Sequence, residues 1–167
     1  MRIDYSDFTK AIGEKFDQPN TVFETLFQLA DSVIGAKLFT LTVIDKTRSE
    51  ARRIYTNMPD AYPLQGTKPM VDDDWSRQVL VQHKTFVANS IQGISEVFSD
   101  YKLIQSLGCE ATMNIPIVLA DEVLGTLNCL HEAGHYSTKR IQRSEELKLP
   151  GALAFLLNLN LSQGKFL

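Results

Sequence analysis

Residues 109–132 constrain the fold of this chain most strongly. They read CEATMNIPIVL, then ADE, then VLGTLNCLHE. Two runs of β-branched and aliphatic residues flank a polar turn at Asp121–Glu122, which is the pattern of an antiparallel strand pair. Pro116 and Gly125 interrupt these otherwise apolar runs. We expect both strands to be central and buried.

Length and charge bound the class of protein. The 167 residues, 44% hydrophobic and 22% charged, suit one globular domain. The net charge of −3 argues against a nucleic-acid-binding surface. No apolar run approaches membrane-spanning length, and the N-terminus lacks the apolar stretch of a secretory signal. With two cysteines, the chain is expected to be cytoplasmic, with free thiols and with no nucleic-acid or membrane partner.

The rest of the chain predicts a mixed order of helices and strands, which indicates an α+β fold. Arg52 and Arg53 fit an edge strand with solvated charges. The predicted segments are helices over 4–16 and 21–34, strands over 37–44 and 50–57, a proline-rich loop over 58–70, a helix after Asp72–Asp74, a strand over 85–89, short helices within 91–107, the strand pair, and helices from Ser137 to Leu161.

Three stretches resemble a GAF domain. They are the strand pair NIPIVL and VLGTLN, the first strand LFTLTVID, and the turn IQSLG before Cys109. The chain 1–167 is similar to a stand-alone GAF protein, with a GAF core over 20–163 and a helical extension over 1–19. The resemblance implies a six-stranded antiparallel sheet, with the terminal helices on one face and the connecting helices and loops on the other. It also implies that the domain senses a small molecule, and it leaves that molecule and any cofactor unknown.

Polar side chains alternate with apolar ones along the strand pair. Thr112 and Asn114 share one face of the first strand, and Thr126 and Asn128 repeat the pattern in the second. Buried polar groups need partners, which a ligand, ordered water or covering helices supply. Alternatively, these are ordinary core residues bonded to backbone. The resemblance implies a pocket here, and the predicted ligand-binding residues are Tyr62, Trp75, Phe98, Tyr101, Cys109, Thr112, Asn114 and Asn128. The cyclic-nucleotide signature of some GAF domains is absent.

The segment His131–His135 reads HEAGH and matches the H-E-x-x-H pattern of zinc peptidases. That chemistry needs both histidines on one helix. Here the motif follows a strand, Gly134 disfavours a helix, and Ser137 marks the start of the next one. We therefore expect a polar loop and no metal site.

The two cysteines offer a second candidate chemistry. Some GAF proteins reduce free methionine sulfoxide, which requires a nucleophilic thiolate and a resolving thiol. Cys129 lies in a strand expected to be central, where cysteine is usually inert packing. Cys109 is the more plausible pocket residue. Neither cysteine has a neighbouring histidine, so the resemblance does not favour a covalently bound bilin.

We therefore expect a cytoplasmic sensing or regulatory module with no catalytic residues, whose output passes through a partner or through oligomer contacts. Two alternatives remain open. One is a thiol-based reductase that uses Cys109, and the other is a structural dimerisation module with a vestigial pocket.

The terminal helices carry more apolar residues than one buried face needs. Such a surplus predicts a homodimer. Alternatively, the two terminal segments cover each other within one monomer. The residues concerned are Tyr5, Phe8, Ile12, Phe16, Leu147, Leu149, Leu153, Phe155, Leu156, Leu157, Leu159 and Leu161.

Overall fold

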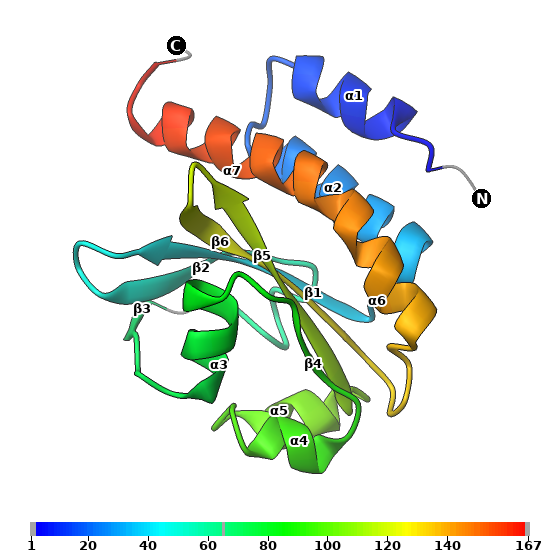
Figure 1. The fold of residues 1–167 in the computed structure, drawn as a ribbon. Coiled ribbons are helices and arrows are strands. Elements are labelled where there is room, and N and C mark those ends of the chain that lie inside the picture. The colour runs from blue at the N-terminus through cyan, green and yellow to red at the C-terminus, as the bar shows by residue number, and fades with distance from the viewer. Residues whose placement is uncertain (1–2, 65, 166–167) are drawn as a thin grey trace.

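A six-stranded antiparallel sheet forms the centre of the molecule (Figure 1). The computed structural model describes residues 3–64 and 66–165. The strands lie side by side in the order β3-β2-β1-β6-β5-β4. The elements are α1 Ser6–Gly13, α2 Asn20–Ile34, β1 Leu38–Asp45, β2 Glu50–Thr56, β3 Thr67–Pro69, α3 Asp74–Ser76, the π-helical segment η1 Arg77–Val81, β4 Phe86–Ala88, α4 Ile91–Ser95, α5 Tyr101–Ser106, β5 Ala111–Leu119, β6 Glu122–His131, α6 Thr138–Ser144, the 3-10 turn η2 Glu145–Leu147 and α7 Lys148–Ser162.

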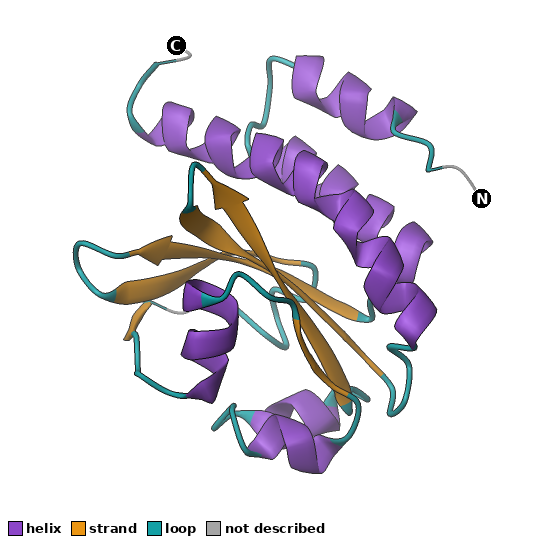
Figure 2. Cartoon of the chain, viewed as in Figure 1, coloured by secondary structure: helices purple, strands orange, loops and turns teal. Residues whose placement is uncertain are grey.

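One face of the sheet is covered by the terminal helices (Figure 2). Helices α2, α6 and α7 form this layer, and α1 packs on α2. Alternate residues of β1, β5 and β6 point into it, among them Leu41, Ile115 and Leu127, which are fully buried. Leu26 of α2 and Phe155 of α7 meet them from the helix side. This layer holds the largest hydrophobic core of the protein.

The other face of the sheet is covered by α3, η1, α4, α5 and the connecting loops. Two smaller hydrophobic clusters lie there, one around Ile94 and Ile104 and the other around Val79. The structure thus confirms the expected α+β class, the six antiparallel strands, and the division between terminal and connecting helices.

The strand pair is a tight hairpin of β5 and β6. Leu119 pairs with Glu122, so Ala120 and Asp121 form the turn. Their φ angles are 51° and 64°, which is the left-handed backbone of the two-residue turns that match the twist of paired strands. The turn therefore lies one residue earlier than the sequence predicts.

Gly125 in β6 allows a close approach of helix to sheet. A Cβ atom at this position would lie 2.6 Å from the Phe155 ring and 2.2 Å from the carbonyl oxygen of Thr42. Only a residue without a side chain lets Phe155 of α7 rest on the strand here. This contact fixes α7 above the central strands.

Two further local predictions are wrong. The strand with Arg52 and Arg53 is not at the edge, because β3 forms inside the predicted loop 58–70 and pairs with β2. A strand of three residues is too short for an alternation pattern to reveal. The first helix spans Ser6–Gly13 instead of 4–16. It begins at Ser6 because the Asp4 carboxylate accepts hydrogen bonds from the backbone N–H and hydroxyl of Ser6.

Candidate functional site

A cavity of about 240 Å³ lies between the sheet and the segment that runs from β2 to α5. Its floor is the face of the sheet opposite the terminal helices. Because β1, β5 and β6 are neighbours, alternate residues of the three strands meet on this floor. The floor residues are Thr40, Thr42, Ile44, Thr112, Asn114, Thr126, Asn128 and Leu130.

A chain of hydrogen bonds crosses the floor. The indole Nε1 of Trp75 donates to Asn114 Oδ1 over 3.0 Å, and Asn114 Nδ2 donates to Asn128 Oδ1 over 2.8 Å. Asn128 Nδ2 then donates to the hydroxyl oxygens of Thr40 and Thr42, each at 3.1 Å. The strand register places Asn114 opposite Asn128, and Asn128 opposite Thr40. Each amide is therefore held by its cross-strand neighbour, which gives the floor a fixed geometry.

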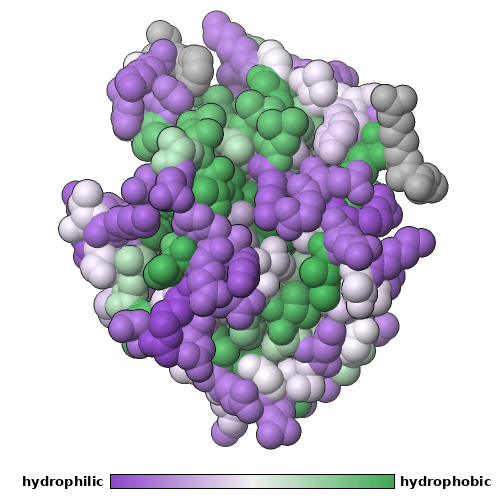
Figure 3. Space-filling model, in the orientation of Figure 1, coloured by the Kyte–Doolittle hydropathy of each residue, from purple (hydrophilic) through white to green (hydrophobic). Residues whose placement is uncertain are grey.

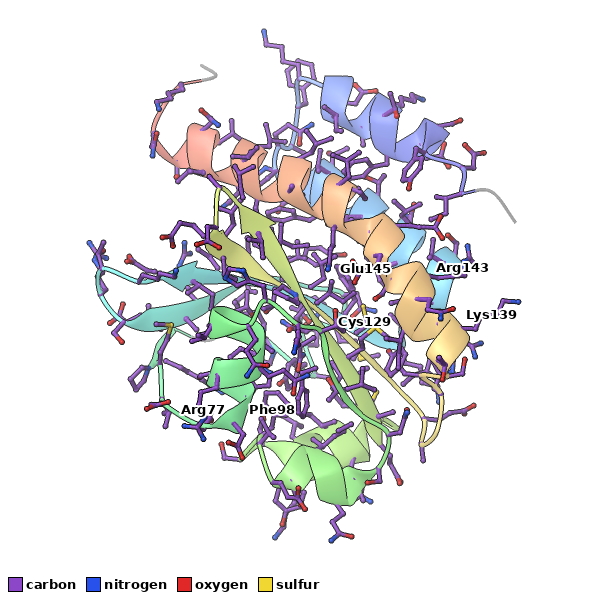
Figure 4. All side chains as sticks on the ribbon, viewed as in Figure 1. Arg77, Phe98, Cys129, Lys139, Arg143 and Glu145 are labelled. Atoms are coloured by element: carbon purple, nitrogen blue, oxygen red, sulfur yellow. The ribbon has the colours of Figure 1, made fainter. Side chains whose placement is uncertain are left out.

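Aromatic and aliphatic side chains wall the cavity. The rings of Trp75 and Phe98 meet edge to face with centroids 6.4 Å apart, and Ile104 and Leu130 add aliphatic surface. Figure 4 shows Phe98 on the α3 side of the sheet, whereas Cys129 lies toward the layer of α6 and α7. A few fixed polar groups within apolar walls are the usual composition of a small-molecule site.

Charged groups line the outer part of the cavity. The Arg53 guanidinium stacks over the Tyr62 ring at 3.8 Å and donates to the carbonyl oxygen of Pro63 over 2.6 Å. The Tyr62 hydroxyl donates to Asp100 Oδ2 over 2.6 Å. Burial, together with this hydrogen bond, raises the pKa of Tyr62, so its hydroxyl remains protonated at neutral pH.

Six of the eight predicted site residues line this cavity, and two do not. The six are Tyr62, Trp75, Phe98, Thr112, Asn114 and Asn128. Tyr101 and Cys109 pack beside them in the cluster around Ile94 and Ile104, outside the cavity lining. Whether the cavity binds a ligand stays a prediction.

Thr40, Thr42 and Arg53 are among the lining residues that were not predicted from the sequence. Thr40 and Thr42 alternate with Leu41 in β1, the same polar alternation that marked β5 and β6, so the pattern was present in the sequence. Arg53 was expected to be solvated, but β3 shields its strand and its side chain is half-buried in the cavity wall.

Both thiols are shielded from solvent. Cys109 and Cys129 are both fully buried. Burial raises the pKa of the Cys109 thiol, and burial likewise raises that of Cys129. A thiol with a raised pKa forms little of the reactive thiolate at neutral pH.

The HEAGH segment brings His131, Glu132 and His135 together, and their possible ligand atoms lie within 4.8 Å of one another. The two imidazole rings are stacked, with centroids 3.5 Å apart and planes 11° from parallel. Imidazole lone pairs lie in the ring plane, so two stacked rings do not point at one ion. His131 Nδ1 accepts from the backbone N–H of Glu132, and His135 Nε2 bonds the carbonyl oxygen of Ile34. The arrangement suits a loop tied to the end of α2, and the absence of a metal stays a prediction.

Solved GAF domains share this fold. The GAF domain of a two-component sensor histidine kinase from Bacillus halodurans matches with a TM-score of 0.67 at 13% identity, over 87% of this chain and 98% of that chain. The GAF domain of a phosphoenolpyruvate-protein phosphotransferase from Coxiella burnetii matches with 0.66 at 15% identity, over 94% and 92%. The GAF domain of the cyanobacteriochrome TePixJ matches with 0.61 at 16% identity, over 90% and 94%. No family model matches the sequence, and no curated protein matches it.

Proposed function

Since the chain has the GAF fold, we propose that it is a small-molecule-sensing or regulatory domain that binds its ligand in the cavity above β1, β5 and β6. One observation carries the proposal. The floor of the cavity is a chain of four polar side chains on central strands, where a purely structural core would be apolar. The proposal is also supported by the fold that this chain shares with GAF domains of a sensor histidine kinase and a cyanobacteriochrome.

Native mass spectrometry of freshly purified protein tests the proposal, because a ligand that stays bound is identified by its mass. The matched variants are Thr42→Phe, which places a ring in the cavity, and Thr47→Phe, which adds the same ring to an exposed turn. We expect a bound small molecule in the wild type and in Thr47→Phe, and its loss in Thr42→Phe. Equal loading of all three proteins contradicts the cavity as the binding site.

A reductase that uses Cys109 has less support. The thiol is buried, lies outside the cavity lining and has a raised pKa. Reduction of free methionine sulfoxide at an enzyme-like rate, abolished by Cys109→Ser, would establish that alternative.

The free thiols and the net charge of −3 favour a cytoplasmic protein without a nucleic-acid partner. No helix in the described part of the chain is long and apolar enough to cross a membrane.

We also propose that the terminal helices form a homodimer interface. Phe16 is 77% exposed and Leu149 is 71% exposed, and Leu153 and Leu159 of α7 are also exposed. Hydrophobic residues gather over the place of α7 in Figure 3. Within the monomer, α1 packs on α2 and leaves this part of α7 uncovered. An uncovered apolar patch suits a second copy of the chain, because a symmetric dimer buries the same patch of both copies.

Light scattering at micromolar concentration tests the dimer. We expect a dimeric mass that Leu159→Asp converts to a monomeric one. Leu119→Asp is the control, because Leu119 has a similar exposure at the hairpin, outside the terminal helices. A monomeric wild type would contradict the dimer and would support the alternative that the terminal segments cover each other within one monomer.

A further inference from the structure

We propose that the cavity takes a small aromatic carboxylate, with its carboxylate bound by Thr40, Thr42 and Arg53 and its ring held against Trp75 and Phe98. This inference rests on the proposed function of the cavity as a ligand site, and it names the chemical class of the ligand.

The direction of the hydrogen-bond chain is fixed by Trp75. An indole N–H can only donate, so the atom of Asn114 that faces it is the carbonyl oxygen. The amide nitrogen of Asn114 then faces Asn128, whose facing atom must in turn be its oxygen. This leaves Asn128 Nδ2 toward the two threonine hydroxyls. Every bond in the chain therefore runs from the indole toward β1.

The hydrogen-bond chain ends on two hydroxyl groups that can each still donate a hydrogen bond. Thr40 and Thr42 each accept from Asn128 Nδ2, and within the described residues neither donates to a protein acceptor. The Thr40 side chain is buried, and both residues line the cavity. A buried hydroxyl proton without an acceptor is unfavourable. A ligand that satisfies both must present an acceptor, and a carboxylate has two oxygens.

Arg53 adds a charge at the same place. It pairs with Thr42 across β1 and β2, so the two side chains leave the sheet on the same face. Its guanidinium contacts a ring and a neutral carbonyl oxygen. In the described part of the chain, neither Arg53 nor Lys68, which also lines the cavity, forms an ion pair with a carboxylate.

The acidic residues of the lining are already engaged. Asp73 accepts from the backbone N–H of Ser76, where it caps α3, and Asp100 accepts from the Tyr62 hydroxyl. The free donors of the cavity therefore suit a ligand that carries a negative charge. A volume of about 240 Å³ leaves room for one ring with its acid group.

Trp75 makes the test direct, because it is the only tryptophan of the chain and it lines the cavity. Its fluorescence is titrated at constant ionic strength with three probes of nearly equal shape, namely benzoate, neutral benzamide and cationic benzamidine. One charge-assisted hydrogen bond changes affinity by about tenfold. We expect benzoate to bind at least about tenfold more tightly than benzamide, and benzamidine to bind most weakly.

Variants assign the preference to the named groups. We expect Arg53→Gln to weaken the binding of benzoate by about tenfold and to leave the binding of benzamide unchanged. Arg52→Gln, on the exposed side of the same strand, is the control and should change neither. Thr42→Val keeps the shape but removes a donor, and should also weaken benzoate. Melting temperatures identify any variant that fails to fold.

Three results overturn the inference: benzamide or benzamidine binding as tightly as benzoate, unchanged benzoate binding in both Arg53→Gln and Thr42→Val, or no response to millimolar benzoate. These results leave the sensing function standing if native mass spectrometry shows a neutral or cationic ligand that Thr42→Phe removes. The sensing function itself fails only if no ligand of any class depends on the cavity.

Discussion

Replacing Asn128 with leucine tests whether the polar floor of the cavity is a single bonded unit. Asn128 accepts one hydrogen bond from Asn114 and donates two, to Thr40 and Thr42. Leucine has a similar volume and makes none of these bonds. The amide nitrogen of Asn114, which is buried, loses its acceptor. An unsatisfied buried donor costs about 1–3 kcal/mol, so we expect the free energy of unfolding to fall by about 2 kcal/mol. For a chain of 167 residues this corresponds to a melting temperature lower by about 6 °C.

The assay is denaturant unfolding followed by Trp75 fluorescence and by circular dichroism. A double-mutant cycle with Asn114→Leu isolates the coupling between the two amides. Once one amide is replaced, replacing the second should lower the free energy of unfolding little further, because no unsatisfied partner is left. We therefore expect a coupling free energy of about 1–2 kcal/mol between the two positions. Asn158→Leu, an amide of α7 outside the cavity, is the control. Strictly additive single variants would refute the bonded floor.

Four further predictions follow from the packing and the titrating groups. Gly125→Ala should lower the free energy of unfolding by about 3 kcal/mol in the same assay, because the new methyl group overlaps the Phe155 ring and a backbone carbonyl. A change below about 1 kcal/mol contradicts the close contact. Ala120→Gly should raise it by about 0.5–1 kcal/mol, since φ is 51° there, and an unchanged midpoint of unfolding refutes this. The Cys129 thiol should react with thiol reagents far more slowly in the native protein than in guanidinium; equal rates would contradict its burial. Burial lowers the pKa of His135 from 6.5, so the unfolded chain binds more protons than the folded protein. The free energy of unfolding should therefore fall as the pH drops below 6.5. This loss of stability should be smaller in His135→Gln.

The hairpin and the layers of this fold were predictable because their signals are local or periodic. The apolar runs of β5 and β6 identify central strands, and their alternation assigns Met113 and Asn114 to opposite faces, as the structure confirms. Sequence patterns also located the loop of HEAGH, because Ser137 caps α6 as predicted.

The rest of the site depends on contacts between distant segments. Arg53 was predicted to be solvated because a three-residue strand, β3, leaves no periodic signal. Cys109 was predicted in the pocket because it was expected to begin a pocket strand. In the structure β5 begins at Ala111, and the Cys109 side chain packs in the cluster with Leu38 and Leu130. The bond between Trp75 and Asn114 joins residues 39 positions apart, and no spacing rule predicts it.

Ligand-observed NMR with a fragment library tests the central claim most directly. The library is screened in parallel against the wild type, Thr42→Phe and Thr47→Phe, all at equal concentration and with equal melting behaviour. We expect to find fragments that bind the wild type and Thr47→Phe but do not bind Thr42→Phe. A library in which no fragment distinguishes Thr42→Phe from the other two proteins would contradict a ligand site above the central strands.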